Sequence, residues 1–350
     1  MKKTTKLFLL LALIAAAAVA LTACAGEQGP AGPAGPAGPA GPAGPAGPAG
    51  PAGADGAAAM VEAGDLSCTE CHVDTSLITA KKFQWEESVH GNGTAAAYAG
   101  GRSGCSNCHS GATFSDRVAA GENPEEHEGV TAVTRQDCRA CHQIHTTYTG
   151  ADWALETTDP VELFATEGVT YDGGDGNLCV QCHQARRAFP EAEDGVVTGI
   201  SEHWGPHHGP QSDMLLGVAG GGVEGKPSAH YQMVEDTCVA CHASNDGANH
   251  AFAPDIAVCQ ACHADAEDFN INGLQDDVQA MLDELGEALV AAGVLSETGP
   301  DGHPTVEEAP EGLAIGLYNW IYVAHEDKSM GVHNPAYTKA LLQAGLDALP

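Results

Sequence analysis

The sequence has few basic residues: 14 Lys and Arg stand against 47 Asp and Glu, giving a formal net charge of −33. Three of these basic residues, Lys2, Lys3 and Lys6, lie at the N-terminus, which leaves 11 (14 − 3) for the rest of the chain. Nucleic acid is therefore excluded as a partner, because nothing would neutralise its phosphates. A solvated acidic surface accounts for the charge, and a basic docking partner is compatible with it but not required.

The sequence also has only a single long apolar run. The one run that exists, residues 7–21, follows the lysines and closes on Leu21-Thr22-Ala23-Cys24, whereas the later apolar window at residues 312–324 is too short to span a bilayer. This pattern predicts a lipoprotein signal peptide at residues 1–23, with Cys24 lipidated and the chain exported and anchored to the cell envelope. The alternative is an ordinary signal peptide with an incidental cysteine.

Glycine recurs at every third position from Gly26, with eight G-P-A triplets from Gly29 to Ala52. Only glycine fits at the axis of a collagen triple helix, so the repeat predicts a collagen-like stalk at residues 24–58. Such a stalk would make a homotrimer. The alternative is a monomeric spacer in the polyproline II conformation.

Cysteine usage defines the remaining domain, residues 59–350. Apart from Cys24, all of the 13 cysteines fall into six C-x-x-C pairs, each followed at once by histidine. The motifs are Cys68-Cys71-His72, Cys105-Cys108-His109, Cys138-Cys141-His142, Cys179-Cys182-His183, Cys238-Cys241-His242 and Cys259-Cys262-His263.

The C-x-x-C-H motif is the attachment signature of c-type haem. Two thiols on one turn add to the two vinyl groups, and the adjacent histidine reaches the iron. A zinc ribbon also uses C-x-x-C pairs but has no need of histidine after every pair. The sequence therefore predicts six covalently bound c-type haems, with the six motif histidines as proximal iron ligands.

Each iron needs a second ligand, and eleven further histidines are present. We expect histidine at all six positions, which implies lower potentials than histidine and methionine together would give. The predicted distal ligands are His90, His145, His207 or His208, His230, His250 and His333. The sequence does not decide among His203, His207 and His208, which share one loop, and it favours exposed positions for His127, His303 and His325.

His145 follows the third motif in the stretch "CRACHQIH". The two axial ligands of a haem lie on opposite faces, but side chains three residues apart on a helical turn have Cβ atoms only about 5–6 Å apart. His145 therefore cannot share an iron with His142. We expect it to ligate a neighbouring haem, and the alternative is a surface histidine.

Regular secondary structure is concentrated near the C-terminus. Leu274, Val278, Leu282, Leu285 and Leu289 recur at helical spacing, which predicts an amphipathic helix over residues 274–295. Further helices are expected over residues 311–326 and 335–349. Earlier segments show no sustained alternation that would indicate a sheet. We expect a mainly α fold with much irregular loop, wrapped around six closely packed haems.

The chain resembles the multihaem cytochrome c superfamily over roughly residues 65–349. The resemblance is carried by the C-x-x-C-H series and by the stretches "CRACHQIH", "GPHHGPQSDML" and "YNWIYVAHEDKSMGVHNPAY". That grouping contains cytochrome c nitrite reductase, octahaem tetrathionate reductase, hydroxylamine oxidoreductase and extracellular electron-carrying cytochromes. The resemblance implies that His333, in the G-V-H-N-P ending, is a distal ligand.

The chain departs from the enzymes of this superfamily. All six motifs end in histidine, whereas the nitrite reductases carry one ending in lysine, and no tyrosine can be nominated as the haem cross-link of the hydroxylamine oxidoreductases. An electron carrier, with no catalytic residue, is thus favoured over an enzyme. Its expected partners are redox proteins, an extracellular acceptor or stacked copies of itself. The alternatives are a reductase of a small nitrogen or sulfur oxyanion at one open haem, and a surface adhesin.

Overall fold

The computed structural model describes residues 76–350 except 125, 208 and 245–248. The chain divides into two units, 1–59 and 60–350, and the described residues all belong to the second. The predicted signal peptide (1–23), lipidated Cys24, stalk (24–58), first motif (Cys68, Cys71 and His72) and His208 lie outside the described residues and remain predictions.

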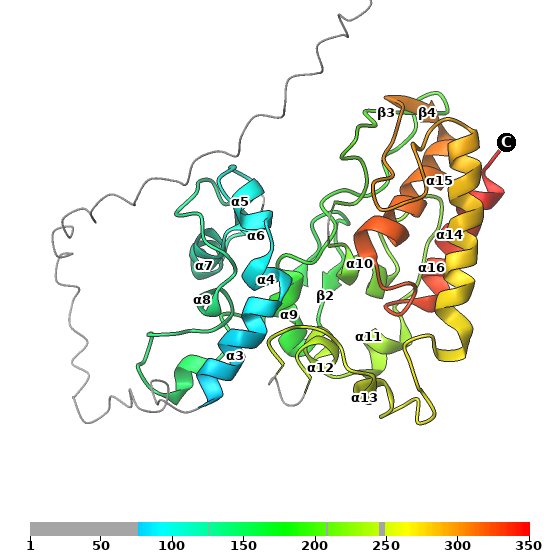
Figure 1. Ribbon diagram of the computed structural model, residues 1–350. Coiled ribbons are helices and arrows are strands. Elements are labelled where there is room, and N and C mark those ends of the chain that lie inside the picture. The colour runs from blue at the N-terminus through cyan, green and yellow to red at the C-terminus, as the bar shows by residue number, and fades with distance from the viewer. Residues whose placement is uncertain (1–75, 125, 208, 245–248) are drawn as a thin grey trace, which may run out of the picture. The chain divides into compact units, whose positions relative to one another are not determined.

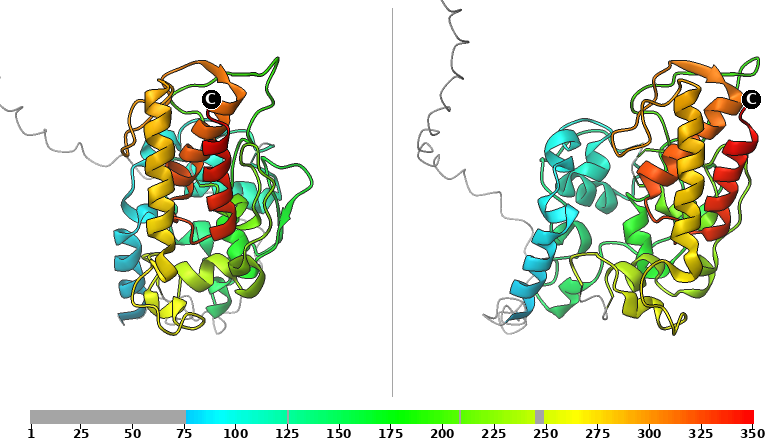
Figure 2. Two further views of the ribbon diagram at one scale, coloured as in Figure 1. Left: turned by 90° about the vertical axis from the view of Figure 1, so that its right-hand side faces the viewer. Right: turned by 45° about the vertical axis from the view of Figure 1, so that its right-hand side comes forward.

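Three long helices near the C-terminus form the main protein core. They are α14 (Leu274–Ala291), α15 (Glu311–Ile321) and α16 (Pro335–Asp347), and they lie side by side in Figures 1 and 2. On α14 the buried face includes Val278, Leu282, Leu285 and Leu289, as the helical spacing predicts. All three helices were expected from the sequence, and α14 ends four residues earlier than the predicted limit of 295.

Small residues allow these helices to approach closely. A Cβ added to Gly345 on α16 would lie 3.1 Å from the Cα of Gly316 on α15, and one added to Gly286 on α14 would lie 2.8 Å from the indole nitrogen of Trp320. Side chains at Gly345 and Gly286 would therefore push the helices apart.

The sequence-predicted helix over 311–326 changes pitch inside the structure. After α15 the chain continues as a π-helix, η4 (Tyr322–Asp327), which ends at Lys328 with a left-handed backbone (φ 59°). The wider turn buries Glu326 and Asp327, although their charges suggested a surface position. The buried Asp327 carboxylate at the end of this π-helix is part of a candidate site.

The first two thirds of the described chain is a series of short helices joined by irregular segments, as expected. The elements before the first strand are α3 (Ser76–Glu87), α4 (Val89–Asn92), α5 (Ala95–Ala99), α6 (Ser106–His109), α7 (Gly111–Ala120), α8 (Cys138–Cys141) and η1 (Gly150–Trp153). Later come η2 (Gly174–Gly176), α9 (Asn177–Val180), α10 (Gln211–Leu216), α11 (Ala229–Met233), α12 (Thr237–His242), α13 (Ile256–Cys259) and η3 (Ile271–Gly273). Two of these, α3 and α7, are longer than the sequence suggested.

The sheets are small. Strands β1 (Val161–Glu162) and β2 (Thr170–Tyr171) pair antiparallel, with Val161 opposite Tyr171. Strands β3 (Val196–Thr198) and β4 (Glu308–Pro310) pair in the same way, with Val197 opposite Ala309. The structure is therefore helix-rich with irregular loops, which confirms the predicted fold class at this level. Among the described helices, none is both long enough and apolar enough to cross a bilayer.

Candidate haem-binding sites

Each described C-x-x-C-H motif folds as one helical turn. The backbone N–H of the motif histidine donates to the carbonyl of the first cysteine at His109 (3.0 Å), His142 (2.9 Å), His183 (2.9 Å) and His263 (2.8 Å), and the fifth motif forms the end of α12. A single turn presents both sulfurs and the imidazole on one side of the backbone. The ten cysteines in the described part of the chain are all free thiols, as thioether attachment requires.

The five described motif histidines each face a second histidine from a distant part of the chain. The separations of the ring centroids fall within 6.1–6.3 Å. The pairs are His109 with His207 (6.3 Å), His142 with His250 (6.2 Å), His183 with His90 (6.1 Å), His242 with His333 (6.3 Å) and His263 with His230 (6.3 Å).

This separation fits a single metal ion between two imidazoles. A metal–imidazole bond is about 2.0–2.1 Å long, and the ring centre lies roughly 1.1 Å behind the bonded nitrogen, so two ligands on opposite faces place their centroids about 6.2–6.4 Å apart. The residues present therefore fit a bis-histidine haem iron, whose remaining four ligands come from the porphyrin.

The second ring nitrogen of five of these histidines has a fixed acceptor. His142 Nδ1 pairs with Trp153 O (2.7 Å) and His242 Nδ1 with Phe252 O (3.0 Å), while His230 Nδ1 pairs with Val332 O (2.7 Å). The acceptors of the other two are side chains: Gln211 Oε1 for His183 (3.1 Å) and Asp327 Oδ1 for His333 (2.6 Å). Each contact holds the proton on Nδ1 and leaves Nε2 as the free donor for a metal.

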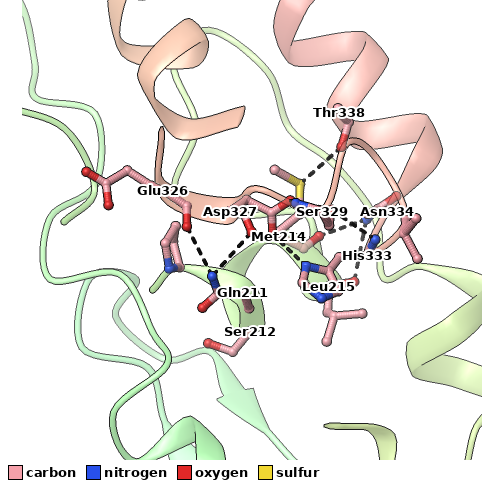
Figure 3. A network of polar contacts seen from close by, with 12 residues as sticks. Gln211, Ser212, Met214, Leu215, Glu326, Asp327, Ser329, His333, Asn334 and Thr338 are labelled. Carbon is pink, nitrogen blue, oxygen red and sulfur yellow. Dashed lines mark hydrogen bonds and ion pairs between the residues drawn. The ribbon is translucent and has the colours of Figure 1, made fainter. Parts of the chain in front are cut away.

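Asp327 and Gln211 connect two of the sites through the π-helix, as Figure 3 shows. Gln211 donates from Nε2 to the carbonyl oxygens of Glu326 (3.1 Å) and Asp327 (3.3 Å). The Asp327 carboxylate accepts from His333 and from Ser329, and it raises the pKa of His333 against the opposing effect of burial. One hydrogen-bond network thus fixes the ring of His333, which faces His242 of the fifth motif, and the ring of His183 in the fourth motif.

His90 lies half-buried opposite His183. Burial first, and then the nearby His183, lowers the pKa of His90 to about 4. The imidazole is therefore neutral at physiological pH, which is the form that binds a metal. The short helix α4 that carries His90 is capped by the Ser88 hydroxyl, which accepts from Gly91 N (3.2 Å).

A small cavity lies at the second motif. Cys105, Cys108, His109 and His207 line it together with Phe164, Gln181, Cys182 and Arg186. An adjoining cavity of about 450 Å³ shares Phe164 and Arg186 with it. His207 enters this space from a loop position with a left-handed backbone (φ 74°), whereas His203 of the same loop is exposed.

His145 is placed differently from the other predicted distal ligands. His142 faces His250, and the exposed His145 ring stacks on Tyr148 with centroids 5.4 Å apart. Asp152 holds this turn by accepting from the backbone N–H groups of His145 (2.8 Å) and Thr147 (2.7 Å).

The motifs lie against one another. Cys182 donates a hydrogen bond to the Cys108 sulfur and Cys179 donates one to the Cys238 sulfur, which lowers the pKa of Cys108 to about 7 and that of Cys238 to about 5. A sulfur in a thioether bond carries no proton, so these contacts matter here because they show that the sulfurs of different motifs lie close together. Cys141 and Cys182 pack against one apolar cluster built on Phe114. The fourth motif is therefore adjacent to the second, third and fifth.

Sequence reasoning missed the residues that fix the ligands and misplaced two histidines. Gln211 carries no local signal, because it acts on His183, 28 residues away. Asp327 and Phe252 lie only 6 and 10 residues from their histidines, but neither belongs to a sequence motif. His127 and His325, expected to be exposed, are partly buried: His127 pairs with Glu122 (2.6 Å), and His325 contacts the Trp320 ring at 4.7 Å. His303 is exposed, as expected.

Comparison with known proteins gives one structural similarity. No protein-family model and no curated protein matches the chain. Among solved structures, the chain is similar to one described as the outer cell wall cytochrome OcwA, at 22% sequence identity and a TM-score of 0.49. The match covers 77% of this chain and 50% of the other, so this chain spans half the length of that protein.

Proposed function

We propose that this protein is a hexahaem c-type cytochrome that carries electrons at the cell envelope. The observation that carries the proposal is the set of five motif histidines, each facing a second histidine at 6.1–6.3 Å. Each of the five pairs joins a motif histidine to a second histidine at the spacing of a shared iron, whereas a structural zinc site would need four protein ligands.

We assign His145 to the haem of the first motif, Cys68, Cys71 and His72. The sequence predicts His145 as a distal ligand of a neighbouring haem, and His142 faces His250 instead. The third and first haems would then be neighbours, since His142 and His145 are three residues apart. The stretch "CRACHQIH" thereby links two cofactors.

The chain's own residues hold the haems in fixed positions. The cysteine sulfurs would hold the porphyrin and the paired histidines would bind the iron, while the Nδ1 acceptors fix the orientations of the histidine rings. A bound haem supplies a one-electron ferric–ferrous couple. Contacts such as Cys108 with Cys182 and Cys179 with Cys238 keep successive sites adjacent, which favours transfer between them.

A reductase requires an iron with one open position. At the second to sixth motifs a second histidine faces the proximal one, so an open iron would have to belong to the first motif. The carrier is preferred because His145 is the predicted distal ligand of that iron. Nitrite, hydroxylamine or tetrathionate would be the substrate class in the alternative.

The envelope location rests on the N-terminal segment. A diacylated Cys24 would anchor the chain, and a stalk over residues 24–58 would hold the haem domain away from the lipid, as a monomer or as a trimer. Electron partners would be redox proteins, an extracellular acceptor or stacked copies of this chain.

Intact-mass analysis of the exported chain tests the haem proposal. We expect a mass increase of six haems that resists acid–acetone extraction, together with full reoxidation by a soluble ferric complex. Fewer than six haems per chain would contradict the count. Steady turnover of nitrite, hydroxylamine or tetrathionate would replace the carrier with the reductase.

A further inference from the structure

Arg117 is a fully buried cation beside the second and fourth motifs. It belongs to α7, its side chain is only 1% exposed, and its guanidinium stacks over the Phe114 ring at 5.3 Å. Arginine keeps its charge even when buried. Burying such a charge is costly unless an opposite charge compensates for it.

The groups that face Arg117 are neutral. Nη1 donates to Glu122 O (3.0 Å) and Gln181 Oε1 (3.1 Å), and Nη2 donates to Gln181 O (3.4 Å). Its Nε has no hydrogen-bond partner among the described residues, and no carboxylate of that part of the chain forms an ion pair with it. Its positive charge is therefore not neutralised by any described side chain.

This charge lies next to attachment sulfurs. The Cys108 Sγ approaches the same carbonyl, Gln181 O, at 4.0 Å, and Gln181 directly precedes Cys182. A second cation, Arg186, lines the cavity that contains Cys105, Cys108, His109 and His207. Two of the few basic residues of an acidic chain thus flank the second motif.

We infer that Arg117 and Arg186 make the haem of the second motif the site of highest reduction potential. An electron shared among the haems would therefore reside mainly at this site. The inference rests on the proposed function. Reduction of a ferric iron adds one electron and lowers the charge of the site by one, so a fixed cation nearby stabilises the reduced form. The effect is strongest for Arg117 because its surroundings exclude water.

The alternative role for Arg117 is structural, since it ties α7 to the loop carbonyls of Glu122 and Gln181. The Arg117→Lys variant separates the two roles because it keeps the charge and loses the planar set of donors. Arg139 is a matched control: it lies inside the third motif, but it is exposed and pairs with Asp137 at 3.2 Å.

The test is a spectroelectrochemical titration of the full chain and of the Arg117→Met, Arg117→Lys, Arg186→Met and Arg139→Met variants, after haem content is checked by mass. We expect Arg117→Met and Arg186→Met to move the same, highest-potential transition to lower potential. Arg117→Lys should retain most of the original value, and Arg139→Met should leave this transition in place.

Other outcomes overturn the inference. One is an unchanged highest transition in both Arg117→Met and Arg186→Met at full haem content; another is a shift in Arg117→Lys as large as in Arg117→Met, which would indicate a structural role. If Arg117→Met fails to fold, the more exposed Arg186 still decides the matter through its own variant. A wild-type chain without covalent haem would instead contradict the proposed function itself.

Discussion

His90 and His183 face each other with ring centroids 6.1 Å apart, although one lies on the short helix α4 and the other ends the fourth haem motif. The interplanar angle of this pair is 73°. We therefore expect His90→Ala to open one coordination position of the fourth haem and turn about one haem in six high-spin, because only that iron loses a ligand. Electron paramagnetic resonance (EPR) of the oxidised protein measures this fraction.

The control for His90→Ala is His303→Ala, since His303 is an exposed loop histidine. His303→Ala should remain fully low-spin. A fully low-spin His90→Ala protein would show that His90 is not a ligand.

Asp327 should tune the fifth haem through His333. Its carboxylate accepts from His333 Nδ1 at 2.6 Å, and such a partner makes the ligand more basic and favours the ferric state. We expect Asp327→Asn to raise the potential of one haem while all six remain bound, as followed by redox titration. The exposed Asp283→Asn on α14 is the control and should leave all haem potentials unchanged. If the haem potentials of Asp327→Asn equal those of Asp283→Asn, the role of Asp327 is disproved.

Phe252 should influence the third and fourth haems through its ring. The ring contacts His90 at 5.1 Å and His250 at 6.0 Å, whereas only the backbone carbonyl of Phe252 serves His242. Phe252→Ala keeps the carbonyl, so we expect changed low-spin EPR signals from two haems and no change at the fifth. The exposed Phe83→Ala on α3 is the control; a change at the fifth haem alone would contradict this assignment.

Asp213 should make the protein less stable as pH rises. Burial raises the pKa of Asp213 to about 6 from its usual 3.8, and its Oδ2 accepts from Ala185 N at 2.8 Å. The folded state therefore holds this proton longer than the unfolded state, so the contribution is complete below about pH 4 and is lost as pH rises to about 6. The loss amounts to about 3 kcal/mol.

Denaturant unfolding of the haem-loaded protein between pH 4 and 7 tests this dependence. Asp213→Asn keeps an acceptor for Ala185 and removes the ionisation. The free energy of unfolding should therefore fall less steeply with pH over this range than it does in the wild type. The exposed Asp277→Asn should retain the wild-type slope. An Asp213→Asn protein with an unchanged slope would refute the explanation.

The fold was predictable where local spacing determines it. The regular recurrence of Leu282, Leu285 and Leu289 was enough to locate α14. Pro335 correctly marked the start of α16. The π-helix after α15 was not predicted, because the spacing of apolar residues in the sequence does not distinguish it from a continued α-helix. Helix α3 was missed because its apolar residues do not form one stripe.

The candidate sites were predictable in kind but not in pairing. The motif fixes both sulfurs and one histidine within five consecutive residues, so these follow from the sequence. Which distal histidine meets which motif depends on long-range folding: His142 faces His250, and His242 faces His333. No sequence pattern singled out Arg117. Its proposed role depends on its burial and on the lack of a described carboxylate partner, and neither can be read from the sequence.

EPR of the fully oxidised wild-type chain tests the central claim most directly. Parallel imidazole planes split the iron d orbitals strongly and give a rhombic low-spin signal, whereas nearly perpendicular planes give one dominant, large g value. The angle is 27° for His142 with His250, but 83° for His109 with His207, 73° for His90 with His183 and 75° for His230 with His263.

We predict six low-spin haems by spin quantification, with a rhombic signal from the third site and large g values from the second, fourth and sixth. A high-spin signal amounting to about one haem in six, lost when nitrite or hydroxylamine binds, would contradict the carrier and reveal an open iron.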